Sequence, residues 1–556
     1  MEAFTGSDLV VRALKKEHIE IIFTLSGVPQ FGMYEALAQE GVRLIDVRHE
    51  QAAVLMAQGY ARATGKPSVA MVAPGPGVLN AVTGIANCFL GSAPVVILSG
   101  QNKLQEYELK AFHEMNHLDL VRSITKWCAT VYDAYRIPEY ISIAFREATA
   151  GMPGPAFVDL PQNILDEIVG EEEATSPEKY RTEARPYGDP RLIAEAVSLL
   201  AGAKRPLIIY GSGIIWSGAH EELVRFVEMS GIPTVPTPLA RGCLPDDHPL
   251  SCFASRSRAQ ADSDVIMFIG ARINFILGYG RPPRFNPQAR TIQIDIVPQE
   301  IGRNRPIDVG IVGDAKAVLT QIAEEWARTG ASGDGAWGKE LKGSEGKKRE
   351  RWLRWAESRE RPVNPIRLCH EIARFLDRDA IVTVDGGEIL DFARNVIPSY
   401  SPGARMNPGV VGLLGVGIPY AIGAKLAHPD RPVLCLCGDG AFGLNGMEID
   451  TAARHGVPIV VVVSNNACWG VCATAQKVIY GQDHAYGTIL ANNRYDLMAQ
   501  ALGCYGELVE DPEEIRPALQ RAFAAGRPAL LNVITDPETV RYNMSTQLKD
   551  LTSAGG

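Results

Sequence analysis

The 556-residue sequence predicts an α/β protein built from three doubly wound parallel-sheet domains. Short apolar runs alternate with longer helix-like segments along most of the chain, which is typical of β-α-β units. The runs are continuously apolar, as strands are when helices cover both faces of a parallel sheet. The units are similar in size and no short repeat period joins them, so we expect three separate sheets.

Composition shifts predict where the domains begin and end. The first domain is expected at residues 1–185, the middle domain at 186–345 and the third at 346–556. A charged stretch rich in helix breakers at 170–190 predicts a linker. Residues 329–361 are rich in glycine and then strongly charged, which favours a loop followed by a solvated helix. The apolar runs are IEIIFTL, VRLIDV, SVAMVA, PVVILSG and PAFVDLP in the first domain, and RPLIIYGSG, IPTVPT, DVIMFIGAR and TIQIDI in the middle one.

The charge balance excludes several classes of partner. Lys and Arg number 55 against 64 Asp and Glu, a net charge of −9, and no long basic run is present, so we expect no nucleic-acid partner. No apolar stretch has membrane-spanning length and the first residues lack the apolar core of a signal peptide, which favours a cytoplasmic protein. The ten cysteines form no CxxC pair, and Cys435 and Cys437 lie in an apolar run, so reduced structural thiols are expected.

Polar residues follow two predicted strands of the third domain. The apolar run 432–437 ends in Gly-Asp-Gly, and the run 458–464 ends in Asn-Asn. Open α/β sheets bind ligands at the carboxyl ends of their strands. Asp439 and Asn466, 27 positions apart, would supply a carboxylate and an amide oxygen to a hard cation such as Mg²⁺, which shares its oxygen ligands with phosphates. The alternative for Gly-Asp-Gly alone is an ordinary strand-to-helix turn.

The spacing GDG, 24 residues, NN, with an apolar strand before each half, resembles the binding motif of thiamine diphosphate (ThDP) enzymes. The resemblance implies that Mg²⁺ is held by Asp439, Asn466 and Cys468. The DGGEIL segment resembles a further loop that contacts the diphosphate, with glycines that provide backbone donors. On this resemblance, the residues expected at the cofactor in the third domain are Gly387, Glu388, Gly440, Ala441, Asn466 and Trp469.

Glu50 follows a predicted strand and begins a predicted helix. The simplest interpretation is an acid stabilised by the helix N-terminus. However, RHEQAA followed by GPG and Asn resembles the pyrimidine-binding domain of ThDP enzymes. In that family a glutamate bonds a ring nitrogen of the aminopyrimidine, so that the exocyclic amine removes the thiazolium C2 proton. The resemblance therefore assigns this role to Glu50 and places Gly75 and Asn80 at the cofactor.

The segment MNPGVVGLLGVGIPYAIGAK resembles the one that bends ThDP into its reactive shape. This implies that Leu414 lies between the two rings of the cofactor and that the carbonyl of Gly412 accepts from the aminopyrimidine amine. A large apolar residue at position 414 is equally suited to a protein core, so the assignment of Leu414 depends on the resemblance.

The middle domain resembles that of 2-hydroxyacyl-CoA lyases and oxalyl-CoA decarboxylases, notably in GARINFILGYG, PPRF and IQIDI. The resemblance implies an acyl-CoA thioester substrate and leaves room for ADP in this domain. Arg256 and Arg272 are candidates for contacts with CoA phosphates, since guanidinium groups pair well with phosphate oxygens. The alternative is that each arginine caps a strand or forms a surface ion pair.

The segment KAFHEMNH departs from these relatives at one position. His113 stands where many lyases and synthases have Gln and the oxalyl-CoA enzymes have Tyr, while Glu114 matches their Glu. A histidine beside the reacting carbon could move a proton near neutral pH. The alternative is a histidine that only donates a hydrogen bond to the substrate. Residues 25–29 contain no histidine, unlike the same segment of the decarboxylases and of benzaldehyde lyase.

The leading hypothesis is a carbon–carbon lyase that converts a 2-hydroxyacyl-CoA to formyl-CoA and an aldehyde or ketone, in either direction. Its catalytic residues are expected to be Glu50, His113 and Glu114. The alternatives are an oxalyl-CoA decarboxylase, a CoA-independent carboligase like benzaldehyde lyase or acetolactate synthase, or a non-catalytic nucleotide-binding regulator. Related enzymes bind ThDP between subunits, so we expect a homodimer or homotetramer. Residues 471–493 and 539–556 are predicted to form mobile covers.

Overall fold

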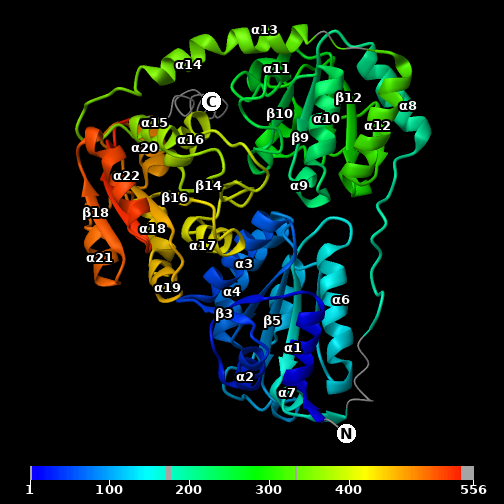
Figure 1. Ribbon diagram of the computed structural model, residues 1–556, viewed down its shortest axis with the longest axis vertical. Helices are drawn as coiled ribbons and strands as arrows, with labels where there is room; N and C mark the ends of the chain where they lie inside the picture. The colour runs from blue at the N-terminus through cyan, green and yellow to red at the C-terminus, as the bar shows by residue number, and fades with distance from the viewer. Residues whose placement is uncertain (1–2, 171–176, 332, 334, 540–556) are drawn as a thin grey trace. The chain divides into compact units, whose positions relative to one another are not determined.

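The computed structural model describes residues 3–170, 177–331, 333 and 335–539. It contains three parallel sheets, which lie in the blue-to-cyan, green and yellow-to-red parts of the chain in Figure 1. The three sheets confirm the predicted fold class. They occur at residues 21–161, 206–312 and 381–534, while the domain boundaries between them stay a prediction.

The chain divides into two compact units. The first unit consists of residues 1–183, 409–430 and 445–457, and the second of residues 184–408, 431–444 and the part from 458 onward. Two segments of the predicted third domain therefore belong to the first unit. As a result, Glu50 and Leu414 lie in the first unit, and Asp439 and Asn466 lie in the second.

The first sheet has the order β3-β2-β4-β5-β7-β6, with all strands parallel. Its strands are β2 (Ile21–Thr24), β3 (Arg43–Asp46), β4 (Ser68–Val72), β5 (Val95–Gln101), β6 (Trp127–Thr130) and β7 (Ala156–Pro161). A separate antiparallel pair joins β1 (Ala3–Thr5) to β8 (Ile168–Gly170). The helices of this unit are α1 (Gly6–Lys16), α2 (Phe31–Gln39), α3 (Glu50–Thr64), α4 (Pro76–Leu90), α5 (His117–Val121), α6 (Ile137–Thr149), α7 (Gln162–Leu165), α17 (Gly417–Ala427) and α19 (Glu448–Arg454).

Helices α3 and α17 approach each other closely enough for their backbones to touch. A Cβ on Gly59 would lie 2.7 Å from the Cα of Tyr420, and a Cβ on Gly423 would overlap the carbonyl oxygen of Met56. Glycine at both positions is therefore required for this packing. The contact fixes the loop that precedes α17 relative to the helix that begins with Glu50.

The middle sheet has the parallel order β10-β9-β11-β12-β13. Its strands are β9 (Pro206–Tyr210), β10 (Thr234–Pro236), β11 (Val265–Ile269), β12 (Arg290–Asp295) and β13 (Val309–Val312). Its helices are α8 (Pro190–Ala201), α9 (Gly213–Ser217), α10 (His220–Ser230), α11 (Arg256–Asp262), α12 (Ala315–Thr329) and α13 (Ala336–Ser344).

Alternate residues of β9 enter two different cores. Ile208 and Tyr210 pack with α8, α10 and α12, whereas Leu207 and Ile209 pack with α11 and α13. Side chains of a strand point to opposite faces in turn, so helices cover both faces and the strand is apolar throughout. Helix α13 contributes the buried Trp337 and Leu341 to the second core. The prediction of a loop in the glycine-rich part of 329–361 is therefore wrong for α13, because this segment is a helix packed into the core.

The third sheet has the parallel order β15-β14-β16-β17-β19-β18. Its strands are β14 (Ile381–Asp385), β15 (Arg405–Met406), β16 (Val433–Gly438), β17 (Val460–Asn465), β18 (Tyr505–Val509) and β19 (Ala529–Ile534). The remaining helices are α14 (Gly346–Leu353), α15 (Pro365–Phe375), α16 (Glu388–Val396), α18 (Asp439–Asn445), α20 (Gly470–Tyr480), α21 (Tyr495–Ala501) and α22 (Ile515–Ala524). Strands β14, β16 and β17 are neighbours, so their carboxyl ends meet at one edge.

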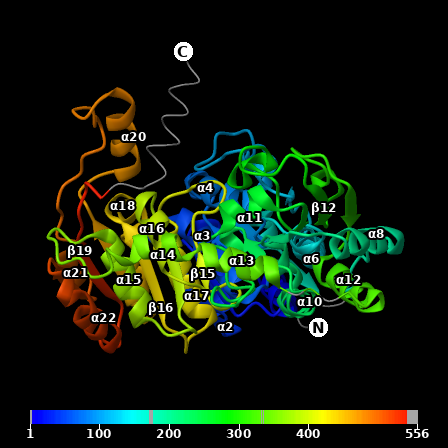
Figure 2. The same cartoon turned by 90° about the horizontal axis from the view of Figure 1, so that it is seen from above.

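Both predicted covers stay predictions, and the structure describes only one of them in full. Residues 471–493 contain α20, which projects beyond α16 and α18 in Figure 2. Hydrogen bonds of 2.7 and 3.1 Å between Gln476 and the backbone of Tyr486 link the helix to its return segment. The C-terminal cover lies outside the described residues, apart from Thr539. All ten cysteines are free, and among the described residues no helix is long and apolar enough to cross a membrane.

Candidate active site

Glu50 is the first residue of α3 and is 6% exposed. Its Oε2 accepts a hydrogen bond from Nδ2 of Asn80 at 2.9 Å. On the other side, Gly77 of α4 lies so close that a Cβ there would be 3.3 Å from Oε1 of Glu50. The structure therefore brings together Glu50 and Asn80, which the sequence predicted to share a site. Asn80 fixes the orientation of the carboxylate.

Gly75 begins the turn into α4 with φ of 61° and ψ of −108°. Residues with a side chain rarely adopt this conformation, and a Cβ here would lie 2.7 Å from the carbonyl oxygen of His113. Glycine therefore allows the backbone of His113 to lie against the turn. In this way the structure also brings Gly75 and His113 together.

The loop before α17 lies in the same unit as Glu50. Asn445 donates to the carbonyl of Gly415 at 2.8 Å and to Oε1 of Gln51 at 3.1 Å, which ties the loop to the first turn of α3. Leu414 is partly exposed and is not a core residue, and Gly412 has a positive φ of 68°. Leu414 is therefore not packed as plain core, while its contact with a cofactor stays a prediction.

His113 and Glu114 differ in what their side chains do. Both carboxylate oxygens of Glu114 accept backbone N–H groups, one from Glu108 and one from Ala111 at 2.9 Å. Glu114 therefore holds the shape of its own loop. The ring of His113 stacks on Phe112 with centroids 3.7 Å apart, and its backbone has a positive φ of 65°. Of the two candidate bases, His113 has the side chain less committed to the loop.

Asp439 follows β16 and is 2% exposed. Burial raises the pKa of its carboxyl to about 6, although backbone N–H groups of Gly440, Asp439 itself, Ala467 and Cys468 favour the charged form. Its second oxygen, Oδ2, is buried without a hydrogen-bond partner. A buried, unpartnered carboxylate oxygen is costly, and a bound cation would compensate for it.

Asn466 is oriented by Glu388. Nδ2 of Asn466 donates to Oε2 of Glu388 at 3.1 Å, so the amide oxygen Oδ1 faces away from that carboxylate. Gly440 packs directly on the ring of Trp469, where a Cβ would lie 2.7 Å from the ring, and a Cβ on Gly387 would lie 2.5 Å from Val471. The ends of β14, β16 and β17 thus bring Gly387, Glu388, Asp439, Gly440, Asn466 and Trp469 to one edge of the sheet.

Three domain families match this chain, and all three are domains of thiamine pyrophosphate enzymes. The N-terminal TPP binding domain of thiamine pyrophosphate enzymes matches residues 4–120, the central domain matches 193–322, and the C-terminal TPP binding domain matches 385–533. Thiamine pyrophosphate is another name for ThDP. The chain belongs to the ThDP enzyme family.

Relatives of this enzyme match it over nearly the whole length. The acetolactate synthase large subunit of Mycobacterium tuberculosis is 36% identical, with 97% of each chain covered. Human 2-hydroxyacyl-CoA lyase 1 is 31% identical over 97% of this chain and 96% of its own. Escherichia coli oxalyl-CoA decarboxylase is 32% identical over 96% and 95%. The predicted family is confirmed, and the activity within it stays open among these.

The residues present fit ThDP with a divalent cation. The donor set is a carboxylate oxygen without a partner, an oriented amide oxygen and the neighbouring backbone, which suits Mg²⁺. Asp439, Asn466 and the carbonyl of Cys468 would hold the ion. No cluster of three His, Cys, Asp or Glu side chains suited to a metal occurs in the described part of the chain.

Arg256 lies in a group of arginines that the sequence did not reveal. Burial lowers the pKa of Arg256 to about 10, and the neighbouring charges of Arg394, Arg241 and Arg284 act in the same direction. Arg405 is fully buried, with its pKa lowered to about 9 by burial and by Arg241. We refer to these five residues, Arg241, Arg256, Arg284, Arg394 and Arg405, as the arginine cluster.

The second arginine suggested for CoA is Arg272. It lies near Asp295 at the end of β12, where its charge opposes the rise in the pKa of that carboxyl caused by burial. The assignment of Arg256 and Arg272 to CoA stays a prediction. No spacing signal could have revealed the arginine cluster, since its members are up to 164 positions apart.

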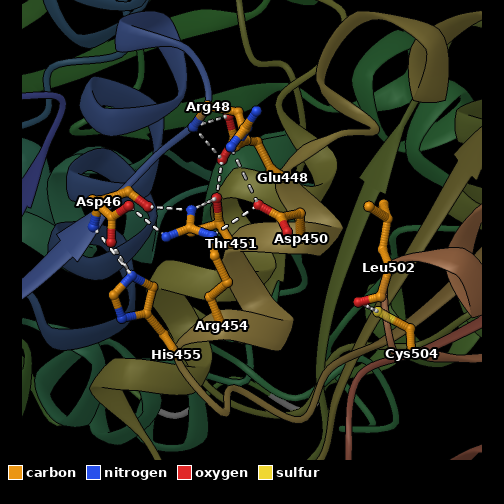
Figure 3. Close-up of polar contacts among 9 residues, drawn as sticks. All are labelled: Asp46, Arg48, Glu448, Asp450, Thr451, Arg454, His455, Leu502 and Cys504. Carbon is orange, nitrogen blue, oxygen red and sulfur yellow. Dashed lines mark hydrogen bonds and ion pairs between the residues drawn. The ribbon is translucent and has the colours of Figure 1, made fainter.

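Glu448 is a further residue that sequence reasoning missed. It is 1% exposed, and its carboxylate accepts from the backbone N–H of Arg48 at 3.1 Å and from the hydroxyl of Thr451 at 2.7 Å (Figure 3). Burial raises the pKa of Glu448 to about 7 against these hydrogen bonds. Because Arg48 lies two residues before Glu50, Glu448 holds the chain segment that leads into the predicted catalytic carboxylate.

Proposed function

We propose that this enzyme is a ThDP- and Mg²⁺-dependent 2-hydroxyacyl-CoA lyase, which breaks the C1–C2 bond of a 2-hydroxyacyl-CoA to give formyl-CoA and an aldehyde or ketone. The observation that carries the proposal is the arginine cluster, which suits the phosphates of CoA. Two of the relatives, the human lyase and the E. coli decarboxylase, are named for CoA thioesters. Their similarity supports a substrate of this class.

The arginine cluster carries a net positive charge, although Arg241 pairs with the carboxylate of Asp246 and Arg394 pairs with that of Asp391 at 3.3 Å. The guanidinium groups of Arg241 and Arg256 lie 4.5 and 4.4 Å from the ring centroid of Phe253. Nε of Arg241 and Nη2 of Arg405 are buried donors without a partner. Burial, and after it repulsion by the neighbouring arginines, lowers the pKa of Arg256, and a phosphate group would relieve the repulsion and satisfy the donors. CoA carries three phosphates, so it suits such a site better than pyruvate or benzoin does.

ThDP, when bound, supplies the nucleophilic carbon and the electron sink for breaking a carbon–carbon bond. The protein must move one proton in the reaction. His113 would take the proton from the C2 hydroxyl of the substrate as the carbonyl product forms, and would return it to C1 to give formyl-CoA. Atoms balance without an oxidant or a second substrate. Glu114 is less suited to this role, because its two oxygens already accept backbone N–H groups.

Arg256→Gln tests the substrate class. The matched control is Arg258→Gln on the same helix, because Arg258 already pairs with two carboxylates, those of Asp262 at 3.2 Å and of Glu340. Loss of a charge-assisted contact with phosphate is expected to raise KM for a 2-hydroxyacyl-CoA roughly ten- to hundredfold. The same variant should leave KM for a pantetheine thioester unchanged, since that substrate lacks the nucleotide phosphates. Equal effects of the two variants on both thioesters would contradict the proposal.

A carboligase of the acetolactate synthase kind is the second candidate, because the 36% identity to the mycobacterial enzyme favours it. The assay that separates the candidates offers 2-hydroxyisobutyryl-CoA, a straight-chain 2-hydroxyacyl-CoA, oxalyl-CoA, pyruvate and benzoin to the protein with ThDP and Mg²⁺. We expect turnover of a 2-hydroxyacyl-CoA and inhibition by free CoA. Faster turnover of pyruvate or benzoin, without inhibition by CoA, would favour the carboligase. Inhibition by ADP would indicate that the nucleotide part alone binds.

A further inference from the structure

A buried hydrogen-bond network lies at the base of the loop that carries His113. Its members are Gln101 at the end of β5, His117 at the start of α5 and Asp159 in β7. Their exposed fractions are 3%, 1% and 2%. Burying polar groups to this degree lowers the stability of the fold unless each group has a hydrogen-bond partner. The positions of their protons therefore matter for what the network does.

The backbone of Gly75 determines the tautomer of His117. The N–H of Gly75 points at Nε2 of His117 over 2.8 Å. A peptide N–H can only donate, so Nε2 must accept and the ring proton lies on Nδ1. Nδ1 then donates to Oδ1 of Asp159 at 2.9 Å. The histidine thus connects a buried carboxylate to a backbone N–H group.

Gln101 completes the network from the other side. Its Oε1 accepts from the backbone N–H of Asn102 at 2.9 Å, so its Nε2 must be the donor to the carbonyl of Met115 at 3.0 Å and to Oδ2 of Asp159 at 3.3 Å. The 3.1 Å contact between Nε2 of Gln101 and Nδ1 of His117 then joins two donors and is not a hydrogen bond. Both oxygens of Asp159 therefore have a donor, and each donor has a fixed orientation.

The network reaches two of the three predicted catalytic residues, Glu50 and His113, through Gly75. His113 lies with its backbone against Gly75, in a left-handed conformation that costs a non-glycine residue energy unless its surroundings impose it. Gly75 also begins α4, and Asn80 of that helix donates to Glu50. A change in the Gly75 turn would therefore displace His113 and the partner of Glu50 together.

We propose that His117 is a positioning residue, which with Asp159 fixes the Gly75 turn and through it the placement of Glu50 and His113. Only the effect on His113 rests on the proposed lyase function. The effect on Glu50 rests on membership of the ThDP family, so it is measurable without knowledge of the substrate.

Two conservative variants separate positioning from packing. In His117→Gln an amide replaces the imidazole and still offers an acceptor to Gly75 and a donor to Asp159. Asp159→Asn keeps the shape of the side chain. Because Nε2 of Gln101 donates to the Oδ2 position, the amide oxygen of the new asparagine is expected to occupy that position. The amide NH₂ then faces Nδ1 of His117 and forces the ring proton onto Nε2, where it opposes the N–H of Gly75. We therefore expect the isosteric aspartate variant to be the more damaging one.

The control is His428→Gln in the same unit, because that partly buried histidine bonds the backbone carbonyl of Ala63 at 3.0 Å, at the opposite end of α3 from Glu50. The first measurement is the nitrogen NMR spectrum of ¹⁵N-histidine-labelled protein. We expect one histidine locked as the Nδ1–H tautomer, absent from the His117→Gln spectrum and switched to Nε2–H in Asp159→Asn. A wild-type His117 signal of the Nε2–H tautomer or of a fully protonated ring would overturn the inference.

The second measurement is the exchange of the C2 proton of bound ThDP for deuterium, which needs Glu50. We expect Asp159→Asn to slow this exchange roughly tenfold or more, since small displacements of a catalytic group cost rate steeply. The exchange rate of His117→Gln should stay within about threefold of the wild-type rate, and that of His428→Gln should be unchanged, by the same reasoning. Wild-type exchange in Asp159→Asn would overturn the inference. If exchange responds as expected but no acyl-CoA is turned over, the proposed lyase function is wrong and the inference stands.

Discussion

Replacing Glu448 by Gln should change how stability depends on pH. The ordinary pKa of a glutamate is 4.5, and burial raises that of Glu448 to about 7. Between these values the folded protein keeps a proton that the unfolded chain has released. The free energy of unfolding therefore falls as pH rises through this window, and a difference of about 2.5 in pKa corresponds to roughly 3 kcal/mol. Glutamine has no proton to lose, so Glu448→Gln lacks this fall.

The variant is thus expected to gain stability relative to wild type as pH rises from 4.5 to above 7, while its amide oxygen still accepts from Arg48. Differential scanning calorimetry at pH 5, 6, 7 and 8 measures this. For a unit of 150–250 residues each kcal/mol shifts the midpoint by roughly 2–4 °C, so the total change is on the order of 6–12 °C. The matched control is Asp450→Asn on the same helix, which breaks a 2.8 Å ion pair with Arg454. That variant should lose no more than about 1 kcal/mol.

The reasoning would be refuted if the difference in free energy of unfolding between wild type and Glu448→Gln changed by less than about 0.5 kcal/mol across this pH range. Such a result would mean that ionising the carboxylate costs the folded protein nothing. A shift of the opposite sign would mean that the hydrogen bonds from Thr451, Arg48 and His49 outweigh burial, and that Glu448 is stabilised as an anion.

Three further predictions concern the cofactor and the assembly. Asp439→Ala should abolish Mg²⁺-dependent binding of ThDP in titration calorimetry, because a carboxylate ligand of the metal is lost. Tight ThDP binding by that variant would contradict the metal site. Glu50→Gln should keep the cofactor but slow C2 proton exchange by orders of magnitude, and an unchanged rate in NMR would argue against its role. Light scattering under assay conditions should show a dimer or tetramer, and an active monomer would exclude a shared site.

Much of the fold could be predicted because helices cover both faces of the parallel sheets. A strand such as β9 sends Ile208 to one core and Leu207 to the other, so its apolar run is unbroken and visible in the sequence. The diphosphate side of the site was predictable for a related reason. Asp439 and Asn466 follow directly on β16 and β17, and the ends of neighbouring parallel strands lie together whatever the rest of the chain does.

Contacts between distant segments were not predictable in this way. Helix α13 lies in a charged, glycine-rich stretch, and only the tertiary structure shows that Trp337 and Leu341 are buried. Glu114 looked like a second catalytic acid, but whether its carboxylate faces substrate or its own loop depends on the turn at 108–114. The arginine cluster joins helices, loops and strand β15 over positions 241 to 405, and no local pattern relates these positions.

The positioning of Glu50 shows why such contacts matter for function. Glu50 begins α3, and three contacts from distant parts of the chain act on it or on its neighbours. Asn80 of α4 bonds its Oε2, Glu448 of α19 holds the backbone two residues before it, and Asn445 ties the loop with Leu414 to the residue after it. Each contact is worth on the order of 1 kcal/mol, which is small beside the rate that a misplaced catalytic group loses. The sequence motif around Glu50 therefore identifies the acid, while residues far from the motif determine its orientation.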